Sequence, residues 1–371
     1  MNMNKAVGFY KHLPISNPDS FEDIMCQLPT IGDHDLLVKV EGVSVNPVDT
    51  FVRCSGRSTK MAHPKVIGWD AVGTVVKVGS ECTLFKPNDQ VWYAGDFKRS
   101  GSDSQYQSVD ERIVGPTPQN LSLQEAAAIP LVGLTAYESL FEKLALSWDI
   151  LKNKGKTILI INGAGGVGSM AIQLAKLVGL RVIATASNPD AIAWVNQLKA
   201  DAVIDHHQDL VKQMHHLKIR DVDYILNLNN LDAHWNEIAE IIKSDGRVTA
   251  TTENHKLIDL QKLTKKRVTF SWEWMYSKSY YQTADMATQN QILTELCQLF
   301  EMEKLMPITT KTYTPINAEH LKRAHRDVES GHMIGKVTLT GLVKLKYKRL
   351  SSYLLSLFSS MLFNLSLVFH T

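Results

Sequence analysis

The chain has 371 residues, of which 44% are hydrophobic, and its formal net charge is +2. That length is sufficient for two domains of ordinary size. The near balance of acidic and basic residues leaves no strongly basic stripe, so a nucleic-acid partner is not expected.

Cysteine usage and the N-terminus favour a reducing compartment. The four cysteines are scattered and no pair has C-x-x-C spacing, which argues against a disulfide framework and against a thiolate zinc cluster. The first 14 residues, MNMNKAVGFYKHLP, contain no apolar core of signal-peptide length. We therefore expect a cytoplasmic protein.

In chain order, residues 1–130 are predicted to form a β domain. Alternating or β-branched runs separated by turns predict strands at 36–45, at 71–79, and in 85–93 after a Pro-Asn-Asp turn. We expect 71–79 to form two short strand pieces, with Gly73 at a bulge or a close approach of two backbones.

From residue 131 onwards, predicted helices and strands alternate. This alternation is typical of βαβ units and a doubly wound parallel sheet, so the predicted fold class is α/β. We assign 131–275 to a nucleotide-binding domain, 276–341 to a segment that completes the β domain, and 342–371 to an atypical tail. The predicted helices are 135–146, 167–178, 189–198 and 234–243, and the predicted strands are 157–162, 181–186, 202–205, 223–228 and 246–251.

The segment INGAGGVGSMAIQLAK, from Ile161 to Lys176, places four glycines within six positions. Gly163, Gly165 and Gly168 fit G-x-G-x-x-G between a predicted strand and a predicted helix, which is the context that gives the motif meaning. The first glycine allows a tight turn, the second lets backbone approach a pyrophosphate, and the third lets the helix pack on the strand. The helix N-terminus then offers unpaired N–H groups to phosphates. A glycine-rich turn without a ligand is the alternative.

The order of motifs resembles the medium-chain dehydrogenase/reductase superfamily. The similarity is greatest to its quinone-oxidoreductase-like branch, which includes proteins called zinc-type alcohol dehydrogenase-like, and it spans about Lys5 to Gly341. The motifs that carry it are GVSVNPVDTFVR, VIGWDAVGTVVKVG, AAAIPLVGLTAYESL, INGAGGVGSMAIQLAK and IGKVTLTG. The resemblance implies a GroES-like β domain, a Rossmann domain and hydride transfer from a nicotinamide.

The resemblance also implies roles for individual residues. Asn46 in VNPVD is expected beside the nicotinamide and the substrate, and it is the one candidate catalytic residue. Thr135 is expected near the nicotinamide, and Lys336 on the cofactor side of the cleft. His206 stands where relatives often place a tyrosine at the edge of the adenosine pocket. The glycine turn contributes Gly163, Gly165, Gly166, Val167 and Gly168.

Zinc is not expected. Zinc-dependent alcohol dehydrogenases carry Gly-His-Glu where this chain has Gly68, Trp69 and Asp70, and Asp49 stands where they carry the first catalytic cysteine. A catalytic zinc needs three converging protein ligands, which these residues do not supply. The predicted metal set is therefore empty.

Two further clusters leave alternatives open. In HHQDLVKQMHH, His207 and His215 would stand about 12 Å apart on a helix, so surface histidines are favoured over a metal site. In FSWEWMYS, Phe270, Trp272, Trp274 and Tyr276 alternate as in a strand with one apolar face. That face is either plain core or a dimer contact, or else the wall of a substrate pocket where flat aromatic rings stack.

The predicted cofactor is NADPH. The second strand of such a sheet usually ends in an acidic residue that binds the ribose hydroxyls of NAD. Here Ser187 and Asn188 fill that place, and the nearest acid, Asp190, follows Pro189. Ser187 can donate to a 2′-phosphate, although the usual basic partner is not evident.

The predicted reaction is NADPH-dependent hydride transfer to a quinone or an α,β-unsaturated carbonyl. Asn46 or a backbone N–H could donate to the developing enolate oxygen, and Tyr106 or water could give the final proton. The alternatives are zinc-type alcohol dehydrogenase activity and a non-catalytic NADPH-binding sensor. The expected partners are a small carbonyl or quinone substrate and a second copy of the chain in a homodimer.

The last 22 residues contain no Asp, Glu, Lys or Arg and follow a basic run, Lys344 to Arg349. A membrane anchor is one interpretation. Six serines, an asparagine and a histidine favour an amphipathic or disordered tail instead, so membrane association is not expected.

Overall fold

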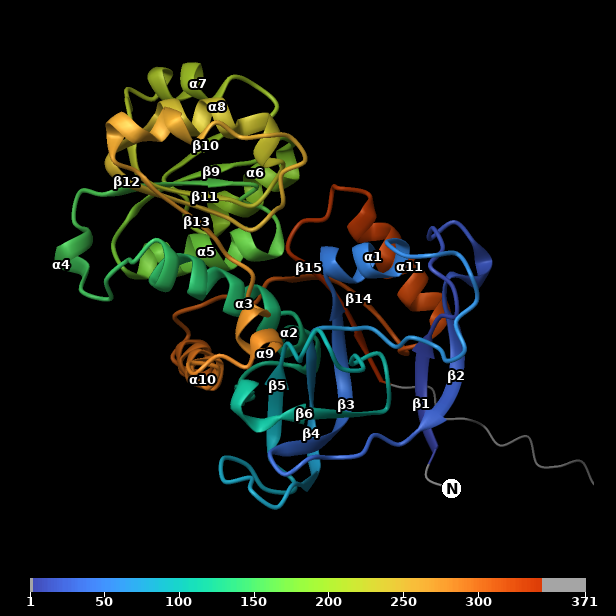
Figure 1. The fold of residues 1–371 in the computed structure, drawn as a ribbon. Helices are drawn as coiled ribbons and strands as arrows, with labels where there is room; N and C mark the ends of the chain where they lie inside the picture. The colour runs from blue at the N-terminus through green and yellow to red at the C-terminus, as the bar shows by residue number, and fades with distance from the viewer. Residues whose placement is uncertain (1–2, 342–371) are drawn as a thin grey trace, which may run out of the picture.

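Two large sheets organise the computed structural model, which describes residues 3–341 (Figure 1). The tail prediction, 342–371, lies outside the described residues. The first sheet has seven strands in the order β14-β15-β3-β4-β5-β7, with β6 also paired to β3. Its strands are β3 Asp35–Val45, β4 Ala71–Val78, β5 Gln90–Tyr93, β6 Tyr106–Asp110, β7 Val114–Pro116, β14 Thr309–Tyr313 and β15 Lys336–Thr340.

The strand predicted in two pieces at 71–79 is one continuous strand, β4. The close approach predicted at Gly73 is confirmed, because a Cβ there would lie 2.1 Å from the Lys39 carbonyl oxygen. The bulge lies on the partner strand instead, where the register shifts between Val40 and Gly42. The glycine therefore lets β3 bend across β4.

Strands distant in sequence meet in this sheet. β15 pairs antiparallel with β3, and β14 pairs with β15. Residues near the C-terminal end of the described chain are thereby placed beside Asn46, which follows β3. A separate antiparallel pair, β1 Met3–Gly8 and β2 Glu22–Gln27, packs nearby.

The second sheet is parallel throughout and has the order β10-β9-β8-β11-β12-β13. Numbered from its own first strand, this is the 3-2-1-4-5-6 order of a doubly wound dinucleotide-binding sheet, so the predicted α/β fold class is confirmed. Its switch point lies between β8 and β11. The strands are β8 Thr157–Ile161, β9 Arg181–Thr185, β10 Ala202–Ile204, β11 Val222–Asn227, β12 Ile242–Ala250 and β13 Thr269–Trp272.

Helices cover both faces of the parallel sheet (Figure 1). The helix predicted at 234–243 begins earlier and ends at Ile241, where β12 starts directly. The buried apolar side chains form two clusters. The larger cluster is continuous from the first sheet to one face of the parallel sheet, and the smaller cluster covers the other face of the parallel sheet. The helices on the two faces of the parallel sheet are α5 Gly166–Leu177, α6 Pro189–Gln197, α7 Leu210–His216 and α8 Leu231–Ile241.

Between the two sheets runs a helix that was predicted at 135–146. It begins earlier, as α3 Pro130–Tyr137, and continues as a π-helix over Glu138–Lys143. Pro130 suits the first turn of a helix, where its missing N–H is not needed. The remaining helices are α1 Pro47–Cys54, α2 Leu123–Ala127, α4 Ile150–Asn153, α9 Ser277–Tyr281, α10 Thr288–Glu301 and α11 Ala318–Glu329, with short 3₁₀ turns at Pro18–Ser20, Glu111–Ile113 and Leu260–Lys266. Within residues 3–341, none of the helices has the length and hydropathy needed to cross a bilayer.

Candidate functional site

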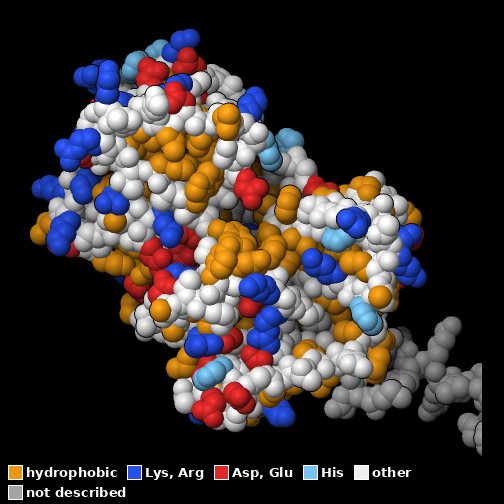
Figure 2. All heavy atoms as spheres, viewed as in Figure 1, with side chains coloured by type: hydrophobic (Ala, Val, Ile, Leu, Met, Phe, Trp, Pro, Cys, Tyr) orange, Lys and Arg blue, Asp and Glu red, His pale blue; other side chains and the backbone are white. Residues whose placement is uncertain are grey.

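A cavity of about 630 Å³ lies between the two sheets, where the carboxyl ends of the parallel strands face the first sheet. Figure 2 shows the hollow between the two lobes with apolar side chains gathered around it. All of the predicted site residues except Gly163 line this one cavity: Asn46, Thr135, Gly165, Gly166, Val167, Gly168, Ser187, Asn188, His206 and Lys336.

The glycine turn connects β8 to α5 at the switch point. Gly163 lies off the cavity wall. A Cβ at this position would lie 2.8 Å from the Ala184 Cβ, so the absence of a side chain allows the turn to pack closely against β9. A Cβ on Gly168 would lie 2.4 Å from the Asn162 carbonyl oxygen, which explains the third glycine of the motif. Gly165 is the N-cap of α5, so the first N–H groups of that helix face the cavity end where a pyrophosphate is expected.

The same turn touches the first sheet. The Gly335 N–H donates to the Ala164 carbonyl at 2.8 Å, and Gly165 and Gly335 form an isolated β-bridge. A Cβ on Gly166 would lie 2.8 Å from Cδ of Lys336. A side chain at position 166 would therefore collide with the Lys336 side chain, which passes over this glycine.

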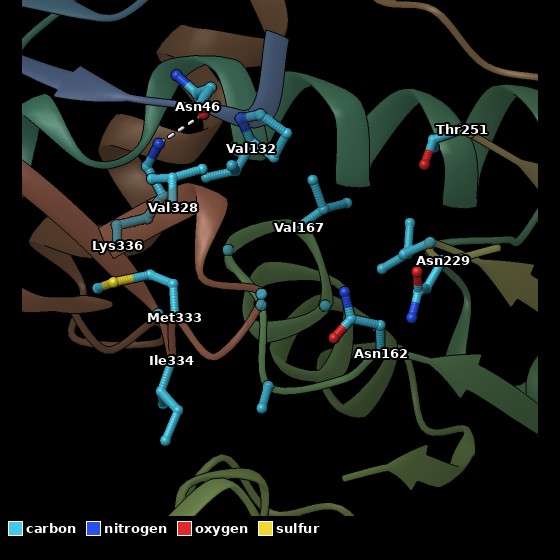
Figure 3. Close-up of a pocket in the computed structure, with 18 of the residues that line it drawn as sticks. Asn46, Val132, Asn162, Val167, Asn229, Thr251, Val328, Met333, Ile334 and Lys336 are labelled. Atoms are coloured by element: carbon cyan, nitrogen blue, oxygen red, sulfur yellow. Dashed lines mark hydrogen bonds between the residues drawn. The ribbon is translucent and has the colours of Figure 1, made fainter. Parts of the chain in front are cut away.

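Lys336 ends in a buried polar network on the side of the first sheet. Its ammonium donates to the Val45 carbonyl at 3.0 Å and to Oδ1 of Asn46 at 2.5 Å, and it lies 3.4 Å from Oδ2 of Asp70. Figure 3 shows the Asn46 and Lys336 side chains pointing toward each other. Only the stem of Lys336 follows the glycine turn, while its charge is directed at Asn46.

Asp70 accepts hydrogen bonds from residues in several segments of the chain. Its carboxylate accepts from the Ser44 hydroxyl at 2.6 Å, the Asn46 amide at 2.7 Å and the Leu131 N–H at 2.8 Å. Burial raises the pKa of Asp70 and lowers the pKa of Lys336, while the attraction between the two groups opposes both shifts. With so many donors around it, we assign Asp70 as the carboxylate and Lys336 as the ammonium.

The residues at the positions of the zinc ligands do not fit a zinc ion. Trp69 is buried and stacks on Phe97 with ring centroids 5.1 Å apart. Asp49 caps α1 by accepting the Asn46 N–H at 2.7 Å, and Asp70 is engaged as described above. Across 3–341, no group of three or more His, Cys, Asp or Glu side chains is arranged to hold a metal ion. Neutral nitrogen and thiolate ligands, which zinc prefers, are missing at these positions.

The opposite end of the cavity is formed after β9 and β10. Ser187 and His206 line it, and the His206 ring lies 3.1 Å from the Thr185 hydroxyl. Burial lowers the pKa of His206, and the neighbouring His207 adds to that effect. The Asn188 side chain caps α6 by accepting the Ala191 N–H at 2.9 Å. The cavity wall at this end thus contains the predicted His206 together with His207, which the sequence pattern around Ser187 did not reveal.

Some sequence predictions receive a different outcome here. Tyr106 lies in β6 and is not part of the cavity wall, so the structure gives no support to a role for it in proton transfer. His215 is exposed on α7, and within residues 3–341 it belongs to no group of three or more side chains that could hold a metal ion. The aromatic run is only partly a strand, because β13 ends at Trp272. Of its rings, Trp274 and Tyr276 line the cavity.

Sequence reasoning missed several wall residues. Asn162, Asn229 and Thr251 follow three parallel strands, and all of them lie at the carboxyl edge of the sheet (Figure 3). Their positions follow from the switch-point rule, which could have found them. Met333 and Ile334 come from the loop before β15, and no local signal marks them.

Comparison with known proteins agrees with this architecture. The model of the alcohol dehydrogenase GroES-like domain matches residues 32–130, and the model of the zinc-binding dehydrogenase domain matches residues 166–289. A zinc-type alcohol dehydrogenase-like protein of Staphylococcus aureus is 40% identical over 336 residues, covering 90% of this chain and 99% of that protein. The 2-methylene-furan-3-one reductase of Solanum lycopersicum is 40% identical over 193 residues, covering 49% and 47%.

Solved structures give the same result. A putative zinc-dependent alcohol dehydrogenase protein from Rhizobium etli is 40% identical with a TM-score of 0.87, covering 93% of this chain and 100% of that chain. The Escherichia coli quinone oxidoreductase complexed with NADPH shares the fold, with 22% identity, a TM-score of 0.75 and coverage of 91% and 99%.

A GroES-like sheet joined to a doubly wound parallel sheet, with the glycine turn at the cleft between them, defines an oxidoreductase of the medium-chain dehydrogenase/reductase superfamily, and the chain belongs to it. Within that superfamily, the similarity to a zinc-type alcohol dehydrogenase-like protein spans nearly the whole length of both chains.

The buried carboxyl of Asp49 should make stability depend on pH. Burial raises its pKa from 3.8 to about 7, so the folded state binds this proton more tightly than the unfolded chain does. Stability from this group is therefore greatest below about pH 4 and falls as pH rises to about 7, by at most ~1.4 kcal/mol per pH unit.

Asp49→Asn removes this titration and keeps an oxygen that can accept the Asn46 N–H. We expect the variant to exceed the wild type in urea midpoint at about pH 8 and to approach it at about pH 5. The exposed Asp190 gives a matched control, Asp190→Asn, which should show no such divergence. A difference between Asp49→Asn and wild type that does not change with pH would contradict the assignment.

Proposed function

We propose that the chain is an NADPH-dependent oxidoreductase that transfers a hydride to a quinone or an α,β-unsaturated carbonyl, without a catalytic zinc. The observation that carries the proposal is the residue set at the zinc-ligand positions. Trp69 has no ligand atom of use to zinc there, and Asp70 is committed to Ser44, Asn46, Leu131 and Lys336. Oxidation of a simple alcohol would call for a Lewis acid that this set does not hold.

The named relatives support the same chemistry. One of them is called a 2-methylene-furan-3-one reductase, and a protein of the same fold is a quinone oxidoreductase complexed with NADPH. Both names describe reduction of a conjugated carbonyl or quinone.

A bound nicotinamide cofactor would supply the hydride. Gly165, Gly166 and the N-terminus of α5 would hold its pyrophosphate, with Ser187 and His206 at its adenosine end. Thr135 and Asn46 would flank its reactive end. The remaining task for the chain is to orient the acceptor and to stabilise negative charge on its oxygen.

Lys336 fixes the orientation of the Asn46 amide. An ammonium only donates, so the amide oxygen faces Lys336 and the amide nitrogen faces Asp70. The nitrogen carries two hydrogens and gives one to Asp70. The second is the donor that we assign to the substrate oxygen. The homodimer and the cytoplasmic location stay predictions.

The first test is turnover. We expect NADPH oxidation with a panel of quinones and enones, and Asn46→Ala should lower kcat by about tenfold to a thousandfold while the Kd for NADPH changes little. Ser44→Ala is the matched control, because it removes another donor to Asp70 from a residue outside the cavity wall. If both variants lose activity equally, Asn46 acts through Asp70 and not on the substrate. If the wild type oxidises no NADPH with any acceptor, the sensor alternative is preferred.

Metal independence is tested separately. Protein produced with added zinc should contain no stoichiometric zinc, and a chelator should leave turnover unchanged, because the side chains at positions 49, 69 and 70 give no ligand set. One tightly bound zinc per chain, with activity lost on its removal, would instead support the zinc-type alcohol dehydrogenase alternative.

Cofactor preference follows from the end of β9. Ser187→Asp places a negative charge where the 2′-phosphate is expected, so NADPH should bind at least about tenfold more weakly while NADH binding is preserved or improved. Fluorescence titration with both cofactors measures this directly, and NADH serves as the internal control. Tighter binding of NADH than of NADPH by the wild-type chain would overturn the preference.

A further inference from the structure

Tyr276 carries a buried hydroxyl that the protein does not satisfy. Its side chain lines the cavity, and the residue is only 3% exposed. Within the described residues, its hydroxyl oxygen has no hydrogen-bond partner. An unpaired buried donor is costly, and native proteins retain few of them. A buried hydroxyl without a partner on the wall of a binding cavity indicates that a ligand atom accepts its hydrogen bond.

The Tyr276 ring packs beside Trp69, which stands where zinc-dependent alcohol dehydrogenases carry a histidine ligand. The Tyr276 ring meets the Trp69 ring edge-on, with centroids 6.2 Å apart. Burial raises the pKa of Tyr276 well above its ordinary value, and the charges of Asp49 and Asp70 raise it further. The phenol is consequently kept protonated, and its O–H remains available as a donor at any working pH.

The segment around Tyr276 is held in place independently of a ligand. The Met275 carbonyl accepts from Nε2 of the buried Gln289 at 2.7 Å, and the Tyr276 carbonyl accepts from the Tyr280 N–H at 2.7 Å. The ring packs against Phe97 and Trp274, with centroids 5.4 and 5.6 Å away. Such support fixes a side chain before a ligand arrives, which is what an efficient donor requires.

We propose that Tyr276 is a catalytic residue that donates a hydrogen bond to the carbonyl oxygen of the substrate, in the place that a metal ion occupies in zinc-dependent relatives. This inference rests on the proposed function and names the group that replaces the Lewis acid. Tyr276 and Asn46 would then form a two-donor site for one oxygen, reached from α9 on one side and from α1 on the other.

The step balances without a metal. A bound nicotinamide would supply a hydride that forms a C–H bond at the β-carbon of the substrate. The C=C π pair would then form a π bond between the α-carbon and the carbonyl carbon, and the C=O π pair would become a lone pair on the enolate oxygen. Tyr276 and Asn46 share hydrogen bonds with that oxyanion and keep their own protons. A proton from water then adds to the α-carbon, and the product is the saturated ketone with oxidised cofactor.

Binding of an oxyanion tests the site without any turnover. The probe is 4-nitrophenolate in alkaline buffer, whose flat ring carries a negative oxygen and whose absorbance shifts when that oxygen accepts a hydrogen bond. We expect the wild-type chain with NADP⁺ to bind and shift the probe, and Tyr276→Phe to bind it at least about tenfold more weakly with a smaller shift. Tyr280→Phe is the matched control, since it removes a hydroxyl from a neighbouring ring of the same aromatic cluster.

Turnover gives the second measurement. Tyr276→Phe keeps the ring packing and should lower kcat for enone reduction by about a hundredfold, with the Kd for NADPH unchanged, while Tyr280→Phe should resemble the wild type. Equal probe binding and equal kcat for wild type and Tyr276→Phe would overturn the inference. So would failure of the wild-type chain to bind the probe. Probe binding that depends on Tyr276, without NADPH oxidation by any acceptor, would reject the proposed reaction and leave the oxyanion site standing.

Discussion

The ion pair between Lys336 and Asp70 is the interaction on which the site depends. A buried charge is costly unless it is paired and hydrogen-bonded, and removing one partner of such a pair costs about 3–5 kcal/mol. Here the pair joins β15 to the residue that precedes β4, and the donors to Asp70 come from β3, the N-cap of α1 and the start of α3. One carboxylate therefore ties together the segments that surround the reactive end of the cavity.

This network also gives a physical reason for the missing metal ligands. A zinc site needs side chains that converge on an empty point, whereas Asp70 faces an ammonium and three further donors. Trp69 fills the histidine position with an aromatic ring that stacks on Phe97. In the reaction proposed here, neutral hydrogen-bond donors would stabilise the charge on the substrate oxygen instead of a metal ion.

Local sequence patterns predicted the parallel strands, the glycine turn and the close approach at Gly73, because each of these features depends on residues that are neighbours in the sequence. They did not predict where a long side chain ends. The family motif predicts Lys336 on the cofactor side of the cleft, but it does not indicate that the ammonium meets Asn46 and Asp70, which are distant in sequence. The sequence patterns also did not predict that the Tyr276 hydroxyl has no hydrogen-bond partner among the described residues. Its alternation with Trp274 suggested a strand, yet β13 ends at Trp272 and the chain turns toward the cavity. Tertiary contacts settle such details, and no short window of sequence contains them.

The backbone bond between Gly335 and Ala164 joins the two lobes directly at the glycine turn. A rotation of one lobe against the other that keeps this bond would have to turn about this point. If the lobes rotate to admit or release a ligand, the phosphate end of the cavity keeps its width, because it lies beside the pivot. The opening then widens with distance from that point, and the far walls travel furthest. A small molecule and a molecule of dinucleotide size would accordingly need different angles of the same rotation to enter or leave the cavity.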